Sequence, residues 1–263
     1  MKGDDRCSYH PSVDKDIFMT DEVQVRAEAP RSESPVVIEG FPGIGLIGNI
    51  ASQYVVNKLE MDYLGAIDSR FFPPISVLVG GVAHMPVRIY EKPELGVVVV
   101  SSDIPVHPAA SYDLARGIVS WAESIGSREM VCLAGITVMG DQQRVFGAAT
   151  NREMLEKIRG EVEVFEFGTI SGISGSVMNE CLLRKMPAIC LLGETHSMAP
   201  DPRAAVVTVK MLNTLYGLQV DTTDLEERAE EIELQMQKLA DQVQSTSAEE
   251  VPGKRELQFP MYG

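Results

Sequence analysis

The segment Val36–Gly48 has the sequence VVIEGFPGIGLIG and decides the fold class. Val36–Glu39 begins with three apolar, β-branched residues, which predicts a buried strand. Leu46–Lys58 then shows helical periodicity. The glycines between the two permit a tight turn and a close approach of helix to sheet. This strand–turn–helix unit predicts an α/β protein.

The same alternation of short apolar runs and helical segments continues to about residue 217. Further strands are expected at Val23–Ala27, Tyr63–Ile67, Ile75–Val82, Val87–Tyr90, Gly96–Ser101, Met130–Ile136, Val162–Phe167 and Ala188–Leu192. Further helices are expected at Ala109–Ile125, Arg152–Arg159, Gly175–Arg184 and Pro202–Tyr216. Strands that are apolar throughout are typical of a sheet covered on both faces. The prediction is therefore a three-layer α/β/α fold with a mixed, mostly parallel sheet.

Composition divides the chain into four parts. Residues 1–34 are expected to be a polar arm with a short strand, and residues 35–220 the α/β domain. Residues 221–243 are an acidic segment with helical periodicity. Residues 244–263 are largely polar and aperiodic, and they predict a flexible tail.

The charge balance restricts the partners. The 263 residues include 23 basic and 38 acidic side chains, a formal net charge of −15. Such a chain repels a phosphate backbone, and the sequence has no long basic run, so a nucleic-acid partner is not expected. No apolar stretch approaches the ~20 residues of a membrane span, and the first residues lack a signal-peptide core. We therefore expect a cytoplasmic protein that does not act on membranes.

The four cysteines form no CxxC pair, so reduced thiols are expected rather than disulfides or a metal site. His107 and His196 follow predicted strand ends, and Glu194 and Asp201 lie near His196 in the sequence. No catalytic spacing such as GxSxG or HExxH accompanies them. The Ser171–Ser176 turn can be read as a helix cap or as an anion-binding loop. We expect no enzymatic activity and no cofactor.

The glycine-rich turn has two interpretations. Gly43, Gly45 and Gly48 spell GxGxxG after a strand, and Asp68 lies at the distance of a ribose-binding acid, which together suggest a dinucleotide site. However, Pro42 removes a backbone donor, and no second strand–helix–strand unit follows Asp68. We favour a structural turn, formed by Gly40, Pro42, Gly43, Gly45 and Gly48. A nucleotide- or nucleoside-binding enzyme is the alternative function.

The acidic segment has a heptad-like apolar seam. Apolar residues recur at spacings of four and three, at Leu225, Ala229, Ile232, Met236, Leu239 and Val243. This pattern is typical of helices that pair with one another, and it also fits a terminal helix docked on its own domain. The seam is therefore a candidate oligomerisation surface. Residues 221–263 carry 11 acidic and 4 basic side chains, so nearly half of the excess charge lies there.

The sequence ends in apolar and aromatic residues after this polar stretch. Met261, Tyr262 and Gly263 follow Phe259 and Pro260. An aromatic side chain next to a carboxylate on a flexible tether is suited to filling a pocket on a partner.

Taken together, these segments resemble the archaeal branch of the proteasome assembly chaperone family. The resemblance rests on Gly40–Gly45, Ser101–Pro105, Gly168–Gly172, Gly193–Thr195 and the acidic terminal helix. It implies a fold similar to nucleoside phosphorylases without their activity, and a homo-oligomer. Met261, Tyr262 and Gly263 are similar to the hydrophobic–tyrosine–any-residue (HbYX) motif, which in some archaeal members binds the α-ring of the proteasome core particle.

The resemblance thus predicts an assembly chaperone or an ATP-independent proteasome activator. Met261, Tyr262 and Gly263 are the expected partner-binding residues. The sequence does not distinguish assembly from activation, and it gives no oligomer number.

Overall fold

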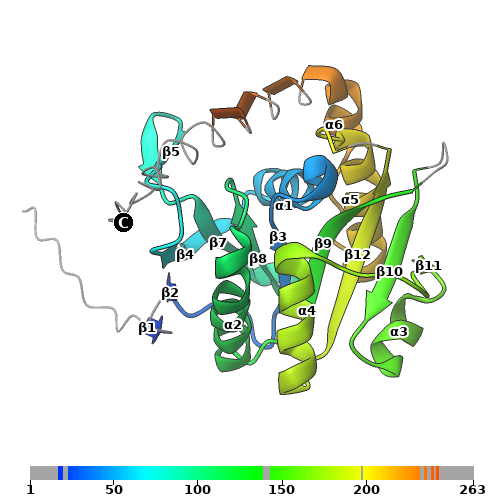
Figure 1. Ribbon diagram of the computed structural model, residues 1–263, viewed down its shortest axis with the longest axis horizontal. Helices are drawn as coiled ribbons and strands as arrows, with labels where there is room; N and C mark the ends of the chain where they lie inside the picture. Colours follow the sequence, from blue (N-terminus) through cyan, green and yellow to red (C-terminus); the bar gives the residue numbers. More distant parts are fainter. Residues whose placement is uncertain are drawn as a thin grey trace, which may run out of the picture.

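A large β-sheet separates two layers of helices, as Figure 1 shows. The computed structural model describes residues 17–19, 23–138, 143–196, 198–231, 234–235, 238–239 and 241–242. The three-layer α/β arrangement predicted from the sequence is confirmed.

The described strands form a ten-stranded sheet and a separate hairpin. The large sheet has the order β1-β2-β4-β7-β8-β3-β9-β12-β10-β11, and the hairpin consists of β5 and β6. The strand bounds are β1 Ile17–Met19, β2 Val23–Ala27, β3 Val36–Gly40, β4 Asp62–Ser69, β5 Val77–Val79, β6 Val82–His84, β7 Val87–Lys92, β8 Val97–Ser102, β9 Glu129–Thr137, β10 Val145–Ala149, β11 Glu163–Val164 and β12 Ala188–Thr195.

The sheet is mixed, as expected, but it is not mostly parallel: five of the nine described strand pairs are antiparallel, and the parallel pairs lie largely at the centre. In the central run β8-β3-β9-β12, each strand is parallel to the next one in the run. The pairs from β1 to β8 on one side are antiparallel, and so is the pair of β12 with β10. The short connections between β7 and β8 and in the hairpin impose antiparallel pairing, because a parallel crossover needs a dozen or more residues.

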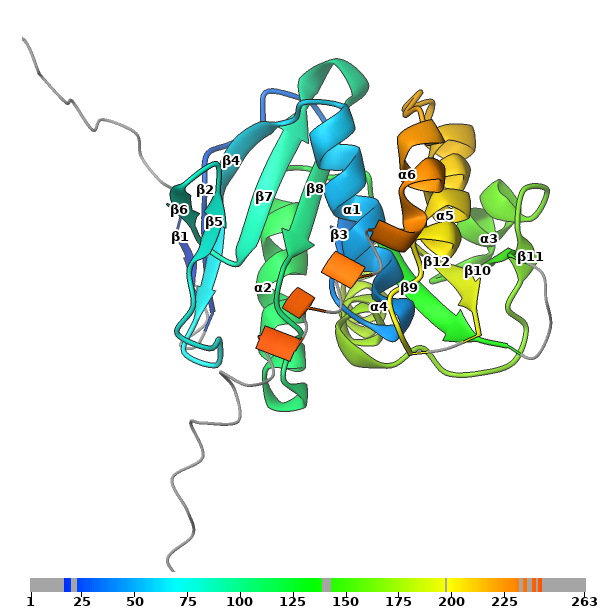
Figure 2. The same cartoon turned by 90° about the horizontal axis from the view of Figure 1, so that it is seen from above.

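The helices cover both faces of the sheet (Figure 2). Their bounds are α1 Ile47–Lys58, α2 Pro108–Ser124, α3 Arg152–Ile158, α4 Gly172–Arg184, α5 Pro202–Tyr216 and α6 Thr223–Glu227. Helices α2 and α4 pack side by side on one face, and α1 and α5 pack together on the other. None of the helices in the described part of the chain is long and apolar enough to span a membrane.

Each face of the sheet has its own apolar core. The cluster under α2 and α4 contains Trp121 and the thiols Cys132, Cys181 and Cys190, which are free and buried. The cluster under α1 and α5 contains residues of α3 and extends to Leu225 in α6. Alternate residues of the central strands point into opposite clusters, which explains why these strands are apolar throughout.

Several expected elements differ from those observed. The strand expected at Ile75–Val82 is the start of the β5–β6 hairpin, which turns at Gly80 and Gly81. Both glycines have positive φ angles, 58° and 84°, as a tight hairpin turn requires. Strand β10 was not expected, and the strand expected at Val162–Phe167 is reduced to β11. Helix α4 begins at Gly172, one turn before the expected start.

Candidate functional site

The glycine-rich turn carries the chain from β3 to α1 at the carboxyl end of the parallel strands. Gly43 has an extended backbone, and a single 3₁₀ turn follows over Ile44–Leu46. Gly45 has a φ of 63°, a conformation that a residue with a Cβ rarely adopts. Leu46 also has a positive φ and directly precedes α1. The turn therefore needs glycine for its backbone conformation at Gly45.

Other glycines serve close packing. A Cβ on Gly48 would lie 2.2 Å from the carbonyl oxygen of Leu133 in β9, and a Cβ on Gly40 would lie 2.3 Å from the Cβ of Ser52 in α1. Both distances are shorter than van der Waals contact. By contrast, nothing lies within 4 Å of a Cβ on Gly43. Gly40 and Gly48 thus allow α1 to sit directly on β3 and β9.

The dinucleotide pattern is not assembled in space. A ribose-binding acid needs a parallel strand next to the one that precedes the glycines. Asp68 lies on β4, which is antiparallel to both of its neighbours and is separated from β3 by β7 and β8. The spacing of Asp68 in the sequence therefore does not place it beside the turn.

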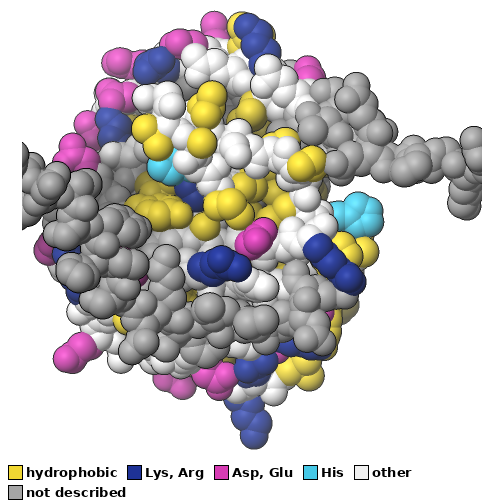
Figure 3. Space-filling model, turned by 90° about the vertical axis from the view of Figure 1, so that its left-hand side faces the viewer, with side chains coloured by type: hydrophobic (Ala, Val, Ile, Leu, Met, Phe, Trp, Pro, Cys, Tyr) yellow, Lys and Arg dark blue, Asp and Glu magenta, His cyan; other side chains and the backbone are white. Residues whose placement is uncertain are grey.

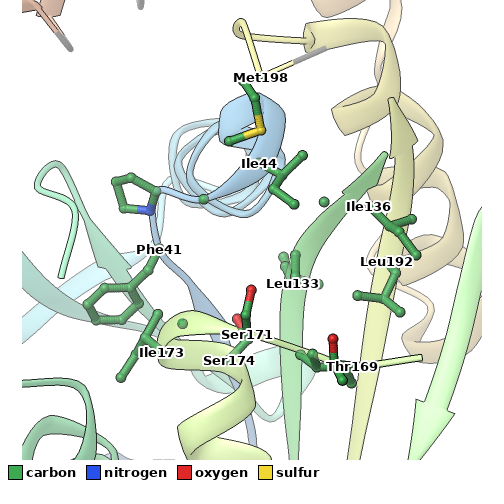
Figure 4. A pocket seen from close by; sticks show the side chains of 16 residues that line it. Phe41, Ile44, Leu133, Ile136, Thr169, Ser171, Ile173, Ser174, Leu192 and Met198 are labelled. Carbon is green, nitrogen blue, oxygen red and sulfur yellow. The ribbon is translucent and has the colours of Figure 1, made fainter. Parts of the chain in front are cut away.

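A pocket of about 270 Å³ opens beside the turn. In Figure 4, Phe41 and Ile44 approach it from the turn, Leu133 from β9, and Ser171 and Ile173 from the start of α4. Its walls are mainly apolar. Ser171 precedes α4 without a side-chain hydrogen bond to the helix end. The interpretation of this loop as a side-chain helix cap is therefore not supported, whereas its interpretation as an anion site stays a prediction.

A buried carboxyl group lies behind the pocket wall. Glu39 is fully buried, and Ser174 Oγ, 3.0 Å away, donates a hydrogen bond to Glu39 Oε2. Burial raises the pKa of Glu39 to about 7, and the hydrogen bond from Ser174 opposes that rise. Glu39 neighbours Cys132 in the register of β3 and β9, and Cys190 is opposite Cys132 on β12.

Burial disfavours ionisation of three cysteine thiols in the core. Burial raises the pKa of Cys132, Cys181 and Cys190 well above the ordinary range of a thiol. Within the ranges that the structure describes, no three histidine, cysteine, aspartate or glutamate side chains are grouped so as to hold a metal ion. Glu39 and the three cysteines are buried and form part of the core.

The loop after β8 is held by polar contacts between residues far apart in the sequence. Asn49 in α1 donates to the carbonyl oxygen of Ser102. Asp103 forms a buried ion pair with Arg88 of β7, 2.7 Å between Nη1 and Oδ2, and accepts a hydrogen bond from Gln53 of α1. These contacts join the antiparallel side of the sheet to α1.

The polar residues Glu194, Asp201 and His107, which the sequence offered as site candidates, form structural contacts. Glu194 is buried and pairs with Arg144, 2.8 Å between Nε and Oε2, which lowers the pKa of Glu194. Asp201 accepts a hydrogen bond from the amide of Ala204 and caps α5. His107 Nδ1 accepts from the amide of Ala109 at the start of α2. The structure thus brings Glu194 together with Arg144, a partner that sequence spacing did not suggest.

The start of the acidic segment is docked on its own domain. Leu225 and Ala229 are only 1% exposed. Lys58 of α1 forms an ion pair with Asp224, and Lys210 of α5 forms one with Glu226. Leu239 is partly buried against the core cluster under α2 and α4. The other seam residues, Ile232, Met236 and Val243, and the motif residues Met261, Tyr262 and Gly263 lie outside the described residues.

Comparison with known proteins identifies the relatives of this fold. The sequence profile of the PAC2 family matches residues 37–240. An uncharacterized protein of Methanocaldococcus jannaschii is 34% identical over 230 residues, which cover 88% of this chain and 93% of the relative.

Two crystal structures from Pyrococcus furiosus are similar along most of their length. PbaA, an archaeal homolog of proteasome-assembly chaperone, has a TM-score of 0.78 and 32% identity over 85% of this chain and 99% of its own. PbaB, an archaeal proteasome activator, has a TM-score of 0.71 and 28% identity over 84% of this chain and 99% of its own.

Proposed function

The chain belongs to the PAC2 family, and from this premise we propose that it is a homo-oligomeric, ATP-independent chaperone or activator of the proteasome. It docks on the α-ring of the core particle through its C-terminal tails. The observation that carries the proposal is the sequence Met261-Tyr262-Gly263 at the end of a chain similar to PbaA and PbaB over most of its length.

The chemistry of the three residues fits a pocket between two subunits of a partner. The ring of Tyr262 offers a large apolar area, and its hydroxyl group tolerates the wet rim of a pocket. Met261 fills an adjoining apolar space. Gly263 contributes its carboxylate, which can pair with a basic side chain of the partner.

The segment before the motif is suited to be a tether. Residues 244–259 could span up to about 50 Å when extended, enough to reach from one stacked ring to another. Ordering such a segment on binding costs entropy, so one tail binds weakly and several tails on an oligomer bind by avidity. The excess of acidic residues from 221 to 263 favours a basic receiving surface.

The experiment that tests this function is capture of a purified archaeal core particle by the full chain. Tyr262→Ala and deletion of residues 261–263 are each expected to reduce capture by at least about tenfold, because the aromatic anchor is lost. Appending one residue after Gly263 is expected to have a similar effect, since the carboxylate is displaced while every side chain is kept.

Tyr262→Phe is the matched control, because it keeps the ring and removes only the hydroxyl group. It is expected to retain most of the capture. Mass and melting temperature of all variants should equal those of the parent chain. If the alanine and deletion variants capture the core particle as well as the parent, the tail is not the docking element. A separate measurement, the rate at which the captured core particle hydrolyses a fluorogenic peptide, distinguishes the two roles. An activator raises this rate, whereas an assembly chaperone does not.

A further inference from the structure

The β5–β6 hairpin exposes a group of large apolar side chains. Leu78 is 69% exposed, Val79 54% and Val82 60%, and Met85 and Tyr63 beside them are also exposed. We call these five residues the hairpin patch. Figure 3 faces this side of the molecule, and hydrophobic side chains gather near the middle of the view, with most acidic side chains toward its margin. Patches of this kind on a folded protein mark interaction sites.

The hairpin has little support within its own chain. Within the described part of the chain, β5 and β6 pair only with each other, so each has a free edge. Every residue from Leu78 to Ala83 is exposed, and a Cβ on Gly80 or Gly81 at the tip would meet no described atom within 4 Å. One aromatic contact, the edge of His84 against Tyr63 with centroids 6.2 Å apart, ties the hairpin to β4. An isolated two-stranded hairpin is marginally stable in water, and a free apolar edge readily accepts another strand.

The charge pattern indicates which partner can occupy the patch. No aspartate or glutamate lies between Asp68 and Glu91, although the chain has 38 acidic residues and a net charge of −15. Two copies of so acidic a chain repel each other over most of their surfaces. Contact between two copies through this acid-free stretch brings no carboxylates of the stretch itself together.

The patch is also self-complementary. Each hairpin has a strand edge that can pair with the edge of a second hairpin, and apolar side chains that can pack against those of the second hairpin. Two identical hairpins can meet around a two-fold axis, so that edge strands pair and form a four-stranded sheet. This arrangement satisfies the backbone groups of the edge and removes Leu78, Val79 and Val82 from water.

We propose that the hairpin patch is the contact surface between two copies of this chain. The proposal rests on the homo-oligomer of the proposed function and names the surface through which two copies of the chain meet. It differs from the seam prediction, since the hairpin and the seam lie on different elements.

The test measures the mass of the full chain by sedimentation equilibrium over a wide range of concentrations. Leu78→Glu combined with Val82→Glu is expected to raise the dissociation constant of self-association at least about 100-fold, because charges replace buried apolar contacts. Leu183→Glu is the matched control, since Leu183 is 72% exposed but lies on α4. Its mass should equal that of the parent. Circular dichroism and melting temperature verify that the variants are folded.

A second measurement does not depend on a disruptive substitution. Val79→Cys in a Cys7→Ser background places an exposed thiol on β5, while Cys132, Cys181 and Cys190 are buried. A short bismaleimide is expected to cross-link two copies through position 79. The same reagent should give no dimer with Leu183→Cys in that background.

Five outcomes would overturn the proposal. The first would be a parent chain that is monomeric at all concentrations. The second would be a hairpin variant that retains the parent mass while position 79 gives no cross-link. The Leu183 control loses mass to the same extent, so that the effect is not specific to the hairpin. Deletion of residues 243–263 alone abolishes self-association, so that the tail is the contact. The hairpin variant keeps its mass but loses capture of the core particle, so that the patch faces the proteasome.

Discussion

The glycine-rich turn and the β5–β6 hairpin are both apolar segments that turn at glycines, yet their environments are opposite. In the turn, Gly40 and Gly48 bring α1 onto the sheet, and the neighbouring polar groups Ser52 and Asn49 are hydrogen-bonded. In the hairpin, Gly80 and Gly81 lie in open space, and the strands have free edges. The comparison teaches that the turn stabilises the fold, whereas the hairpin is available for contacts outside it.

The largest expected effect is on the turn. Gly48→Ala should lower the free energy of unfolding by about 3 kcal/mol, because its Cβ would meet the carbonyl oxygen of Leu133 and push α1 off β9. Gly43→Ala is the control, since a Cβ there meets nothing and the backbone is extended. Urea denaturation of both variants measures the difference. Equal stability of the two variants would show that close packing at Gly48 is not what holds the turn.

A smaller effect that depends on pH is expected at Glu39, whose side chain is buried in the core beside the turn. Burial raises the pKa of Glu39 to about 7 in the folded chain, while an unfolded chain ionises near the ordinary 4.5. The unfolded chain therefore loses this proton first as pH rises. The contribution of Glu39 to stability should fall by about 2 kcal/mol between about pH 5 and pH 7 and level off above.

Glu39→Gln cannot ionise, so its stability should lack this fall. Denaturation at several pH values measures the difference from the parent chain, and Glu166→Gln, at an exposed position, is the control. Parallel pH profiles of the parent and the Glu39→Gln variant would mean that Glu39 is ionised in the folded chain throughout this range.

The smallest effect is expected at the seam. If the seam helps to hold the oligomer, Ile232→Asp combined with Met236→Asp lowers the mass measured by sedimentation. The change should be smaller than that of the hairpin variant, because Leu225 and Ala229 are already buried in their own subunit. A melting temperature that falls at constant mass would instead assign the seam to docking on its own domain. No change in either quantity would show that the seam pairs with nothing.

Local sequence signals were sufficient where an element is long and consistent. Helix α5 has the predicted bounds, Pro202–Tyr216, because a proline at the start and Gly217 at the end punctuate it. Strand β8 was evident from its run of four valines. Strand β10 was not predicted because Gly147 and two alanines give it low β-propensity, and its pairing with β12 and β11 makes it a strand.

The contacts that position the candidate site come from residues far apart in the sequence. Ser174 meets Glu39, Arg88 meets Asp103, and Arg144 meets Glu194. No spacing in the sequence announces these pairs, since the order of strands in the sheet decides which side chains face each other. The strand order also places Asp68 on β4, which two strands separate from β3 and the glycine-rich turn, although its spacing in the sequence fits the dinucleotide pattern.

The sequence by itself determined the α/β class, the alternation of elements and the resemblance to proteasome assembly chaperones, because periodicity and turn residues are local properties. It also contains Met261-Tyr262-Gly263, whose proposed role in docking rests on the chemistry of these residues. Only the tertiary structure decided that Leu225 is buried in its own domain while Leu78 is exposed. Both are leucines in apolar patterns, and what separates them is whether another layer of the same chain packs over them.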